Sequence, residues 1–145
     1  MRFFEHLLTW AAMANSATKR RVLTFLCLCL AVPLGFCMWR YYDGWGRYWV
    51  RYYFSGAVYE VIWCLLFFLF QPSRANVIRI PILVFIGTCI VEFLQLWEPH
   101  LLEALRSTVI GAALMGTSFV WLQFPFYVLG TVLSLIILSL LANIN

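Results

Sequence analysis

Charged residues are scarce in this sequence, and their scarcity excludes a soluble fold. Only 11% of the 145 residues are charged, whereas 64% are hydrophobic and the mean hydropathy is +0.89. A soluble domain is about half apolar and about a quarter charged, so a chain of this length cannot hide so much apolar surface from water. The solvent is therefore lipid, and we expect one all-α transmembrane helix bundle.

The sequence also lacks the residue groupings that bind metals or form redox pairs. Its five cysteines lie inside apolar runs, none forms a CxxC pair, and no histidine-rich tract accompanies them. We interpret the cysteines as small buried hydrophobic residues and predict no metal site and no cofactor. The net charge of +4 comes from scattered basic residues, which does not indicate nucleic-acid binding and is typical of topology signals beside membrane spans.

Four apolar runs are long enough to cross a bilayer. We place these spans at about residues 22–39, 55–71, 77–97 and 122–142, in one membrane domain that covers 22–145. We interpret residues 40–54, which are rich in Tyr and Trp, as a loop. Residues 101–121 hold a shorter, broken apolar run, which leaves an interfacial, re-entrant or short fifth spanning segment open.

Residues 1–21 precede the first span and form a segment of their own in this interpretation. Apolar residues recur there at helical spacing with polar residues between them, and Lys19, Arg20 and Arg21 end the segment. This pattern predicts an amphipathic helix on the membrane surface.

Basic and aromatic residues predict how the spans are oriented. With the N-terminus inside, six Lys or Arg residues fall on the inner side and four on the outer side. Five of the seven tryptophans fall on the outer side, as an aromatic belt. The positive-inside rule then puts both termini in the cytoplasm.

Polar side chains inside the spans predict a site. A charge in the bilayer core costs roughly 2.5–3.5 kcal/mol by insertion measurements, so it needs partners. By the span boundaries above, Glu60, Glu92 and Tyr127 each lie about five residues from the outer interface, which is roughly 7–8 Å deep. We therefore expect one polar cluster in the outer leaflet, with two arginines as counter-charges: Glu60, Glu92, Gln95, Tyr127, Arg51 and Arg106.

The pattern leaves the role of this cluster open. It is either an interhelical hydrogen-bond network that fixes the bundle or a binding or catalytic site. Gly130 and Ser134 form a small-xxx-small pair, which we interpret as a place where two helices pack closely.

Several of these residues also carry a family resemblance. The stretches are Arg51–Tyr59, Glu92–Trp97 (EFLQLW), Arg106–Thr108 and Phe119–Trp121, together with Tyr127 and Gly130. They resemble the small bacterial membrane proteins of the domain-of-unknown-function 2809 family, which is VanZ-like in outline. The likeness covers roughly residues 35–142. It implies four or five helices and a multi-pass protein of the bacterial plasma membrane, but no established activity.

Two functional hypotheses from different classes follow. The first is a non-enzymatic accessory, assembly or small-ligand-binding protein, because the chain is small and poor in catalytic residues. The second is a small intramembrane enzyme acting on lipid or cell-envelope headgroups, with Glu60 and Glu92 as acid and base and the arginines holding a phosphate. The expected partners are the lipid bilayer and either further copies of the chain or a larger membrane complex.

Overall fold

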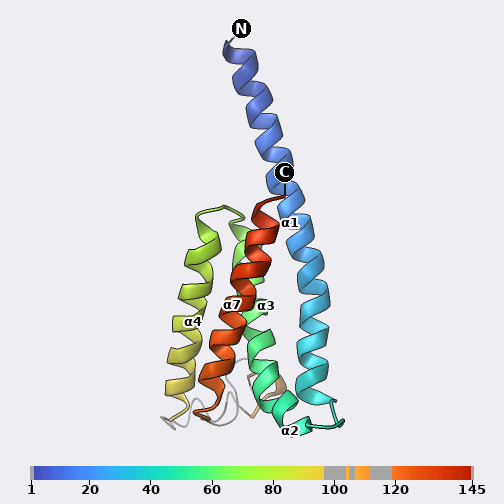
Figure 1. Ribbon diagram of the computed structural model, residues 1–145, viewed down its shortest axis with the longest axis vertical. Helices are drawn as coiled ribbons and strands as arrows, with labels where there is room; N and C mark the ends of the chain where they lie inside the picture. The colour runs from blue at the N-terminus through green and yellow to red at the C-terminus, as the bar shows by residue number, and fades with distance from the viewer. Residues whose placement is uncertain (1, 97–103, 105–106, 112–118, 145) are drawn as a thin grey trace.

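The computed structural model describes residues 2–96, 104, 107–111 and 119–144, with only the backbone described for 2–15. Every regular element in this part of the chain is helical. Four helices are long and apolar enough to cross a membrane, and they run up and down in antiparallel order (Figure 1). They are α1 (Arg2–Arg40), α3 (Ser55–Phe70), α4 (Asn76–Leu94) and α7 (Gln123–Ala142). The prediction of an all-α bundle with four spans is confirmed.

Two boundaries differ from the sequence prediction. Helix α1 continues from Arg2 to Arg40, so the segment 1–21 and the first span belong to one helix. Part of the expected loop 40–54 is also helical, as α2 (Arg47–Trp49) and the π-helix η1 (Val50–Phe54), which lead directly into α3. The reason is that Gly46, in the left-handed conformation at φ 71°, ends the turn, and no glycine or proline follows before α3.

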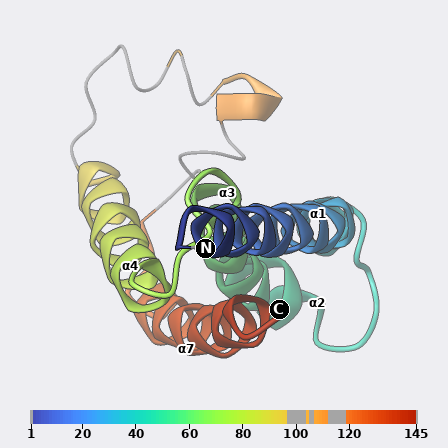
Figure 2. The ribbon, with the colours of Figure 1, turned by 90° about the horizontal axis from the view of Figure 1, so that it is seen from above.

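Helix α3 is the centre of the bundle. It contacts each of the other three long helices, α1, α4 and α7 (Figure 2). Its Cys64, Leu65 and Phe68 are almost fully buried, and Leu138 of α7 is buried against the same core. Lipid chains are as apolar as these side chains, so close packing rather than escape from water stabilises their contacts.

The two ends of the bundle differ in composition. At the α1–α3 end lie the close of α1, helix α2 and the start of α7 (Figure 1). Three exposed tryptophans lie in or next to these segments, namely Trp45, Trp49 and Trp121. The α3–α4 end holds the α3–α4 connection and the C-terminus, and α1 projects beyond it (Figure 1). There, Arg20 Nε donates to Ile144 O at 3.1 Å and ties the C-terminal segment to α1.

Candidate functional site

Glu92 is the centre of a hydrogen-bonded cluster at the α1–α3 end. Its side chain is 1% exposed and accepts three hydrogen bonds. Tyr127 OH donates to Oε2 at 2.9 Å and Gln95 Nε2 donates to the same oxygen at 3.1 Å, while the backbone N–H of Val120 donates to Oε1 at 3.0 Å. Carboxylate oxygens accept strong hydrogen bonds, so these three donors can satisfy an ionised Glu92. No cation among the described residues forms an ion pair with it.

These contacts join α4 to the chain that enters α7. Glu92 lies in the last turn of α4, Gln95 follows directly after the helix, and Val120 precedes α7. Aromatic rings cover the junction: the Phe93 and Phe124 ring centroids are 5.5 Å apart, and Phe124 is 6.3 Å from Tyr127. Glu92, Gln95 and Tyr127 are buried, and burial strengthens their hydrogen bonds.

Glu60 has opposite surroundings. Its side chain is 0% exposed, and Oε2 has no hydrogen-bond partner among the described residues. Thr131 Oγ1 lies 3.4 Å from Oε1, but this hydroxyl donates its hydrogen to Tyr127 O at 2.8 Å. Thr88 also lies beside Glu60, and it donates to Phe85 O at 2.9 Å. Both hydroxyls offer Glu60 mainly lone pairs, which suits a protonated carboxyl that supplies its own hydrogen.

The structure therefore divides the one polar cluster predicted from the sequence into two clusters, which lie one helical turn apart. Thr88 precedes Glu92 by four residues in α4, and Thr131 follows Tyr127 by four in α7, so the Glu60 cluster is about 6 Å deeper. The depth estimate was wrong for Glu60 because the second span begins at Arg47 rather than Ser55. Of the residues expected in one cluster, the structure brings together Glu92, Gln95 and Tyr127.

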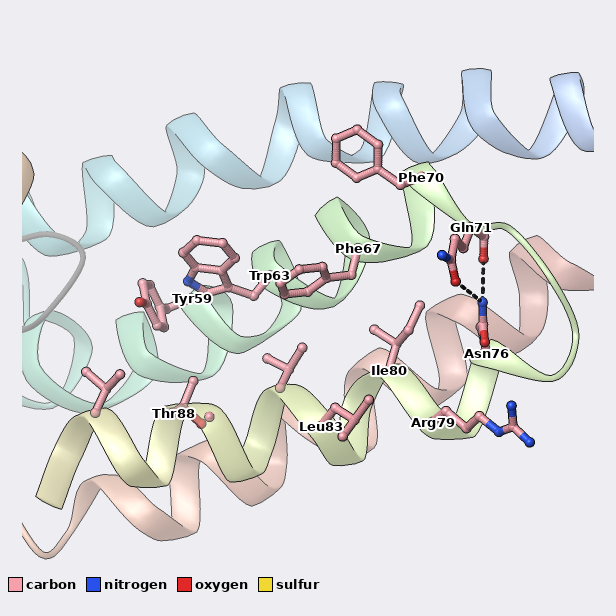
Figure 3. Close-up of a pocket in the computed structure, with 13 residues that line it drawn as sticks. Tyr59, Trp63, Phe67, Phe70, Gln71, Asn76, Arg79, Ile80, Leu83 and Thr88 are labelled. Atoms are coloured by element: carbon pink, nitrogen blue, oxygen red, sulfur yellow. Dashed lines mark hydrogen bonds between the residues drawn. The ribbon is translucent and has the colours of Figure 1, made fainter.

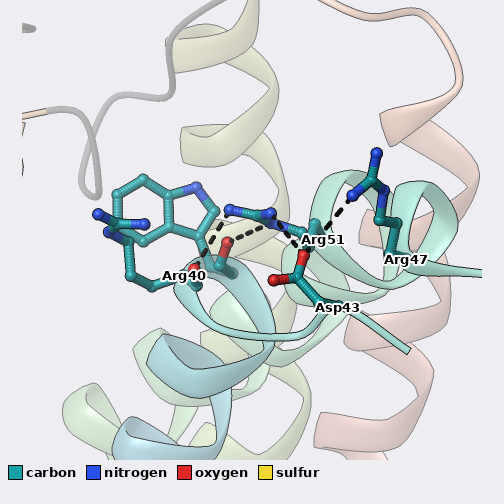
Figure 4. Close-up of polar contacts among 5 residues, drawn as sticks. Arg40, Asp43, Arg47 and Arg51 are labelled. Carbon is teal, nitrogen blue, oxygen red and sulfur yellow. Dashed lines mark hydrogen bonds and ion pairs between the residues drawn. The ribbon is translucent and has the colours of Figure 1, made fainter.

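Arg51 lies away from both acids. Its Nε and Nη2 donate to Trp39 O at 3.1 Å and Arg40 O at 3.2 Å, the last carbonyls of α1. Its Nη1 lies 3.4 Å from Asp43 Oδ1, and Figure 4 shows Arg47 directed at the same carboxylate. Arg51 therefore caps α1 instead of neutralising Glu60 or Glu92. The other expected counter-charge, Arg106, lies outside the described residues.

A laterally open groove runs along α3 between α1 and α4. It consists of two adjoining cavities of about 560 and 380 Å³. Four residues line both cavities and make them continuous: Tyr59, Trp63, Thr88 and Val91. The larger cavity reaches Gln71, Asn76 and Arg79 at the α3–α4 end (Figure 3), and the smaller reaches Gln95, Gln123 and Tyr127 at the other end.

The groove connects the Glu92 cluster to the space where lipid would lie. Tyr127 and Gln95 hydrogen-bond to Glu92 and also line the smaller cavity, whereas neither Glu60 nor Glu92 lines either cavity. A ligand in the groove would thus meet a phenol, amides and aromatic rings, which suit an amphipathic molecule. In the described part of the chain, no group of three or more His, Cys, Asp or Glu side chains could hold a metal ion.

Sequence reasoning missed three features of the site. The Val120 N–H donor could not be predicted from residue type, because every residue except proline carries this donor. Thr88 and Thr131 could have been found as the residues one turn below Glu92 and Tyr127. The groove follows from how α1, α3 and α4 pack, which no local pattern encodes.

Gly130 behaves as the small-xxx-small pattern predicts. A Cβ atom at this position would lie 2.6 Å from both Ala57 O and Glu60 Cβ, so the glycine allows α3 and α7 to approach closely. The same contact holds the backbone of α7 against Glu60.

Comparison with known proteins places the chain in a family. No curated protein and no solved structure matches it. One family matches residues 45–131, which is more than half of the chain and includes η1, α3, α4, Glu60, Glu92 and Tyr127. The chain belongs to this family, which is described as "Protein of unknown function (DUF2809)".

Proposed function

We propose that this chain is a non-enzymatic multi-pass membrane protein that binds a small amphipathic ligand in the groove between α1, α3 and α4. The observation that supports it most is the continuity of the two cavities along α3. A groove of this volume, lined by aromatic and aliphatic side chains with polar groups at both ends, is typical of ligand sites.

The Glu92 cluster supports the groove rather than reacting within it. Tyr127 is held by Glu92 on one side and lines the groove on the other. Gly56 leaves room for its ring, because a Cβ atom there would lie 3.3 Å from Tyr127 Cε1. A rigid, oriented phenol at the groove wall needs no rearrangement when a ligand binds.

The alternative, an intramembrane enzyme with Glu60 and Glu92 as acid and base, has less support. An acid or base must come within hydrogen-bond reach of its substrate. Both carboxyl groups are buried, neither lines the groove, and three donors already occupy Glu92.

Gly87 offers a direct test of the groove. It lines the larger cavity, and nothing lies within 4 Å of a Cβ atom built there, so a side chain can start at this position and Gly87→Trp should fill the groove. The matched control is Ile86→Trp, on the same helix at an exposed position outside both cavities. Binding of dioleoylphosphatidylglycerol to the full chain in detergent is measured by native mass spectrometry.

We expect Gly87→Trp to weaken binding of the first lipid by about fivefold or more, equivalent to ~1 kcal/mol of lost packing. Ile86→Trp should leave that binding unchanged. Thermal unfolding of both variants shows whether the bundle is intact. Equal lipid binding by two folded variants would refute the groove as a ligand site.

We also propose that both termini lie in the cytoplasm. The excess of Lys and Arg in the segments at the α3–α4 end supports this orientation. In a cysteine-free background, single cysteines at Trp45 and Ser73 should react differently with a membrane-impermeant thiol reagent added outside the cell. Only the first should be labelled, and labelling of the second alone would reverse the orientation.

A further inference from the structure

We propose that the groove ligand is an anionic phospholipid whose phosphate lies at Arg79 and whose acyl chain lies along α3 toward Tyr59. The inference rests on the proposed function, and it adds the chemical class and the direction of the ligand. It combines the charge of the groove, its length and the polar groups at its α3–α4 end.

The charge of the groove has one sign. Among the described residues that line the two cavities, Arg79 is the only charged one, and no carboxylate lines either. Arg79 is exposed and forms no ion pair or hydrogen bond with any residue described by the structure. An unpaired guanidinium at the mouth of an apolar groove complements a phosphate, which it can bind through two parallel N–H···O bonds.

The groove also fits the length of one acyl chain. From Arg79 to Thr88 the larger cavity follows α4 over nine residues, which is about 13–14 Å of helix. One leaflet of the hydrocarbon core is about 15 Å thick. In Figure 3, Arg79 lies toward one end of the groove and Tyr59 toward the other, with Phe67 and Leu83 between them. A headgroup at Arg79 thus places the chain beside these apolar side chains.

Two amides line the same end of the groove as Arg79. Asn76 Nδ2 donates to Gln71 O at 3.0 Å and to Gln71 Oε1 at 3.2 Å, so the Gln71 side chain is held by its oxygen. Its Nε2 donates no hydrogen bond to any residue in the described ranges, and it lies at the same end of the groove (Figure 3). It is available to donate to a phosphate or glycerol oxygen, which adds a neutral contact to the arginine.

The opposite end of the groove suits a headgroup less well. Gln95, Gln123 and Tyr127 line it, and Gln95 and Tyr127 already donate to Glu92. A phosphate there would lie near this buried carboxylate, and like charges repel in a medium of low dielectric constant. The chain terminus of the lipid meets no such cost. This difference fixes the direction of the ligand in the groove.

The test compares two arginines at the α3–α4 end. Arg79→Gln removes the charge in the groove, while Arg74→Gln removes an exposed charge that lines neither cavity. Full-length protein in detergent is titrated with dioleoylphosphatidylglycerol or dioleoylphosphatidylcholine, and native mass spectrometry measures binding of the first lipid. The wild-type chain should prefer the anionic lipid. Arg79→Gln should reduce this preference about fivefold, as expected for one arginine near the membrane surface. Arg74→Gln should keep it, and Arg79→Lys should restore it in part.

The outcomes separate this inference from the proposed function. If Gly87→Trp weakens binding of both lipids but Arg79→Gln leaves their ratio unchanged, the groove binds an amphiphile and the phosphate assignment is wrong. An equal effect of Arg74→Gln and Arg79→Gln would also overturn it, because a general surface charge would then be the cause. The last part of the experiment measures binding of soluble glycerol 3-phosphate. If it binds as tightly as the lipid, and Gly87→Trp does not affect it, the ligand is not a lipid.

Discussion

Glu92 and Glu60 are both buried in the bundle, at 1% and 0% exposure, yet they are buried in opposite ways. Glu92 accepts hydrogen bonds from a phenol, an amide and a backbone N–H. Glu60 lies beside two threonine hydroxyls whose shorter hydrogen bonds go to backbone carbonyls, and the contact from Thr131 to Glu60 is long at 3.4 Å. An anion in hydrocarbon needs donors, and a neutral carboxyl needs only an acceptor. We therefore expect Glu92 to act as a structural anchor and Glu60 to be neutral at a helix contact. Four substitutions can break or sharpen this comparison.

The largest effect is expected at Gly130, beside Glu60. Gly130→Leu inserts atoms where a Cβ alone would be 2.6 Å from Ala57 O and Glu60 Cβ, so α3 and α7 must separate. We expect a loss of more than about 3 kcal/mol in the free energy of unfolding, measured by titration with a denaturing detergent. Gly87→Leu is the control, because nothing lies within 4 Å of its Cβ atom. If both variants are equally stable, the close approach of α3 and α7 does not matter.

The next effect is expected from Glu92→Gln. The amide keeps the shape but replaces one acceptor oxygen by a donor, which then faces Tyr127 OH, Gln95 Nε2 or the Val120 N–H. We expect a loss of about 2 kcal/mol, because donors that served a charged acceptor are left unsatisfied. The same detergent titration measures it. A variant as stable as wild type would show that Glu92 is not an anchor.

Removing one donor to Glu92 should cost less. Tyr127→Phe deletes the 2.9 Å hydrogen bond to Oε2 and leaves the other two in place. We expect a loss of about 1 kcal/mol, within the range of interhelical hydrogen bonds in membranes. Combined with Glu92→Gln in a double-mutant cycle, the two losses should not add. Additive losses would mean that the phenol and the carboxylate act independently.

The smallest effect is expected from Glu60→Gln. The amide has nearly the same shape as a neutral carboxyl, and its N–H₂ group can donate to the oxygens of Thr88 or Thr131 as a protonated carboxyl would. The free energy of unfolding should change by less than about 0.5 kcal/mol, in contrast to Glu92→Gln. A loss as large as the one at Glu92 would mean that Glu60 is ionised and that the comparison fails.

Local sequence patterns predicted the helices better than they predicted which side chains contact one another. The apolar runs gave four spans because a bilayer admits few other structures for such a composition. The pairing of Glu92 with Tyr127 was predicted because both spans had clear outer ends. Glu60 was predicted about one helical turn too close to the outer interface. The reason is that the aromatic stretch after Gly46 has the composition of a loop but forms helix. Arg51 was assigned to the acids by its charge and its expected position at the outer side of the bundle, whereas the carbonyls at the end of α1 and Asp43 are its partners.

The sequence by itself determined that this protein is a membrane-spanning helical bundle with acids in its spans, because hydropathy and length suffice for that conclusion. The family followed from short motifs around those acids. Only the tertiary structure decided that α3 is the central helix, that the polar residues form two clusters, and that a groove lies along α3. The physical reason is that the partners of a side chain in lipid depend on helix rotation and close packing. Neither can be predicted from the hydrophobic pattern of a single span.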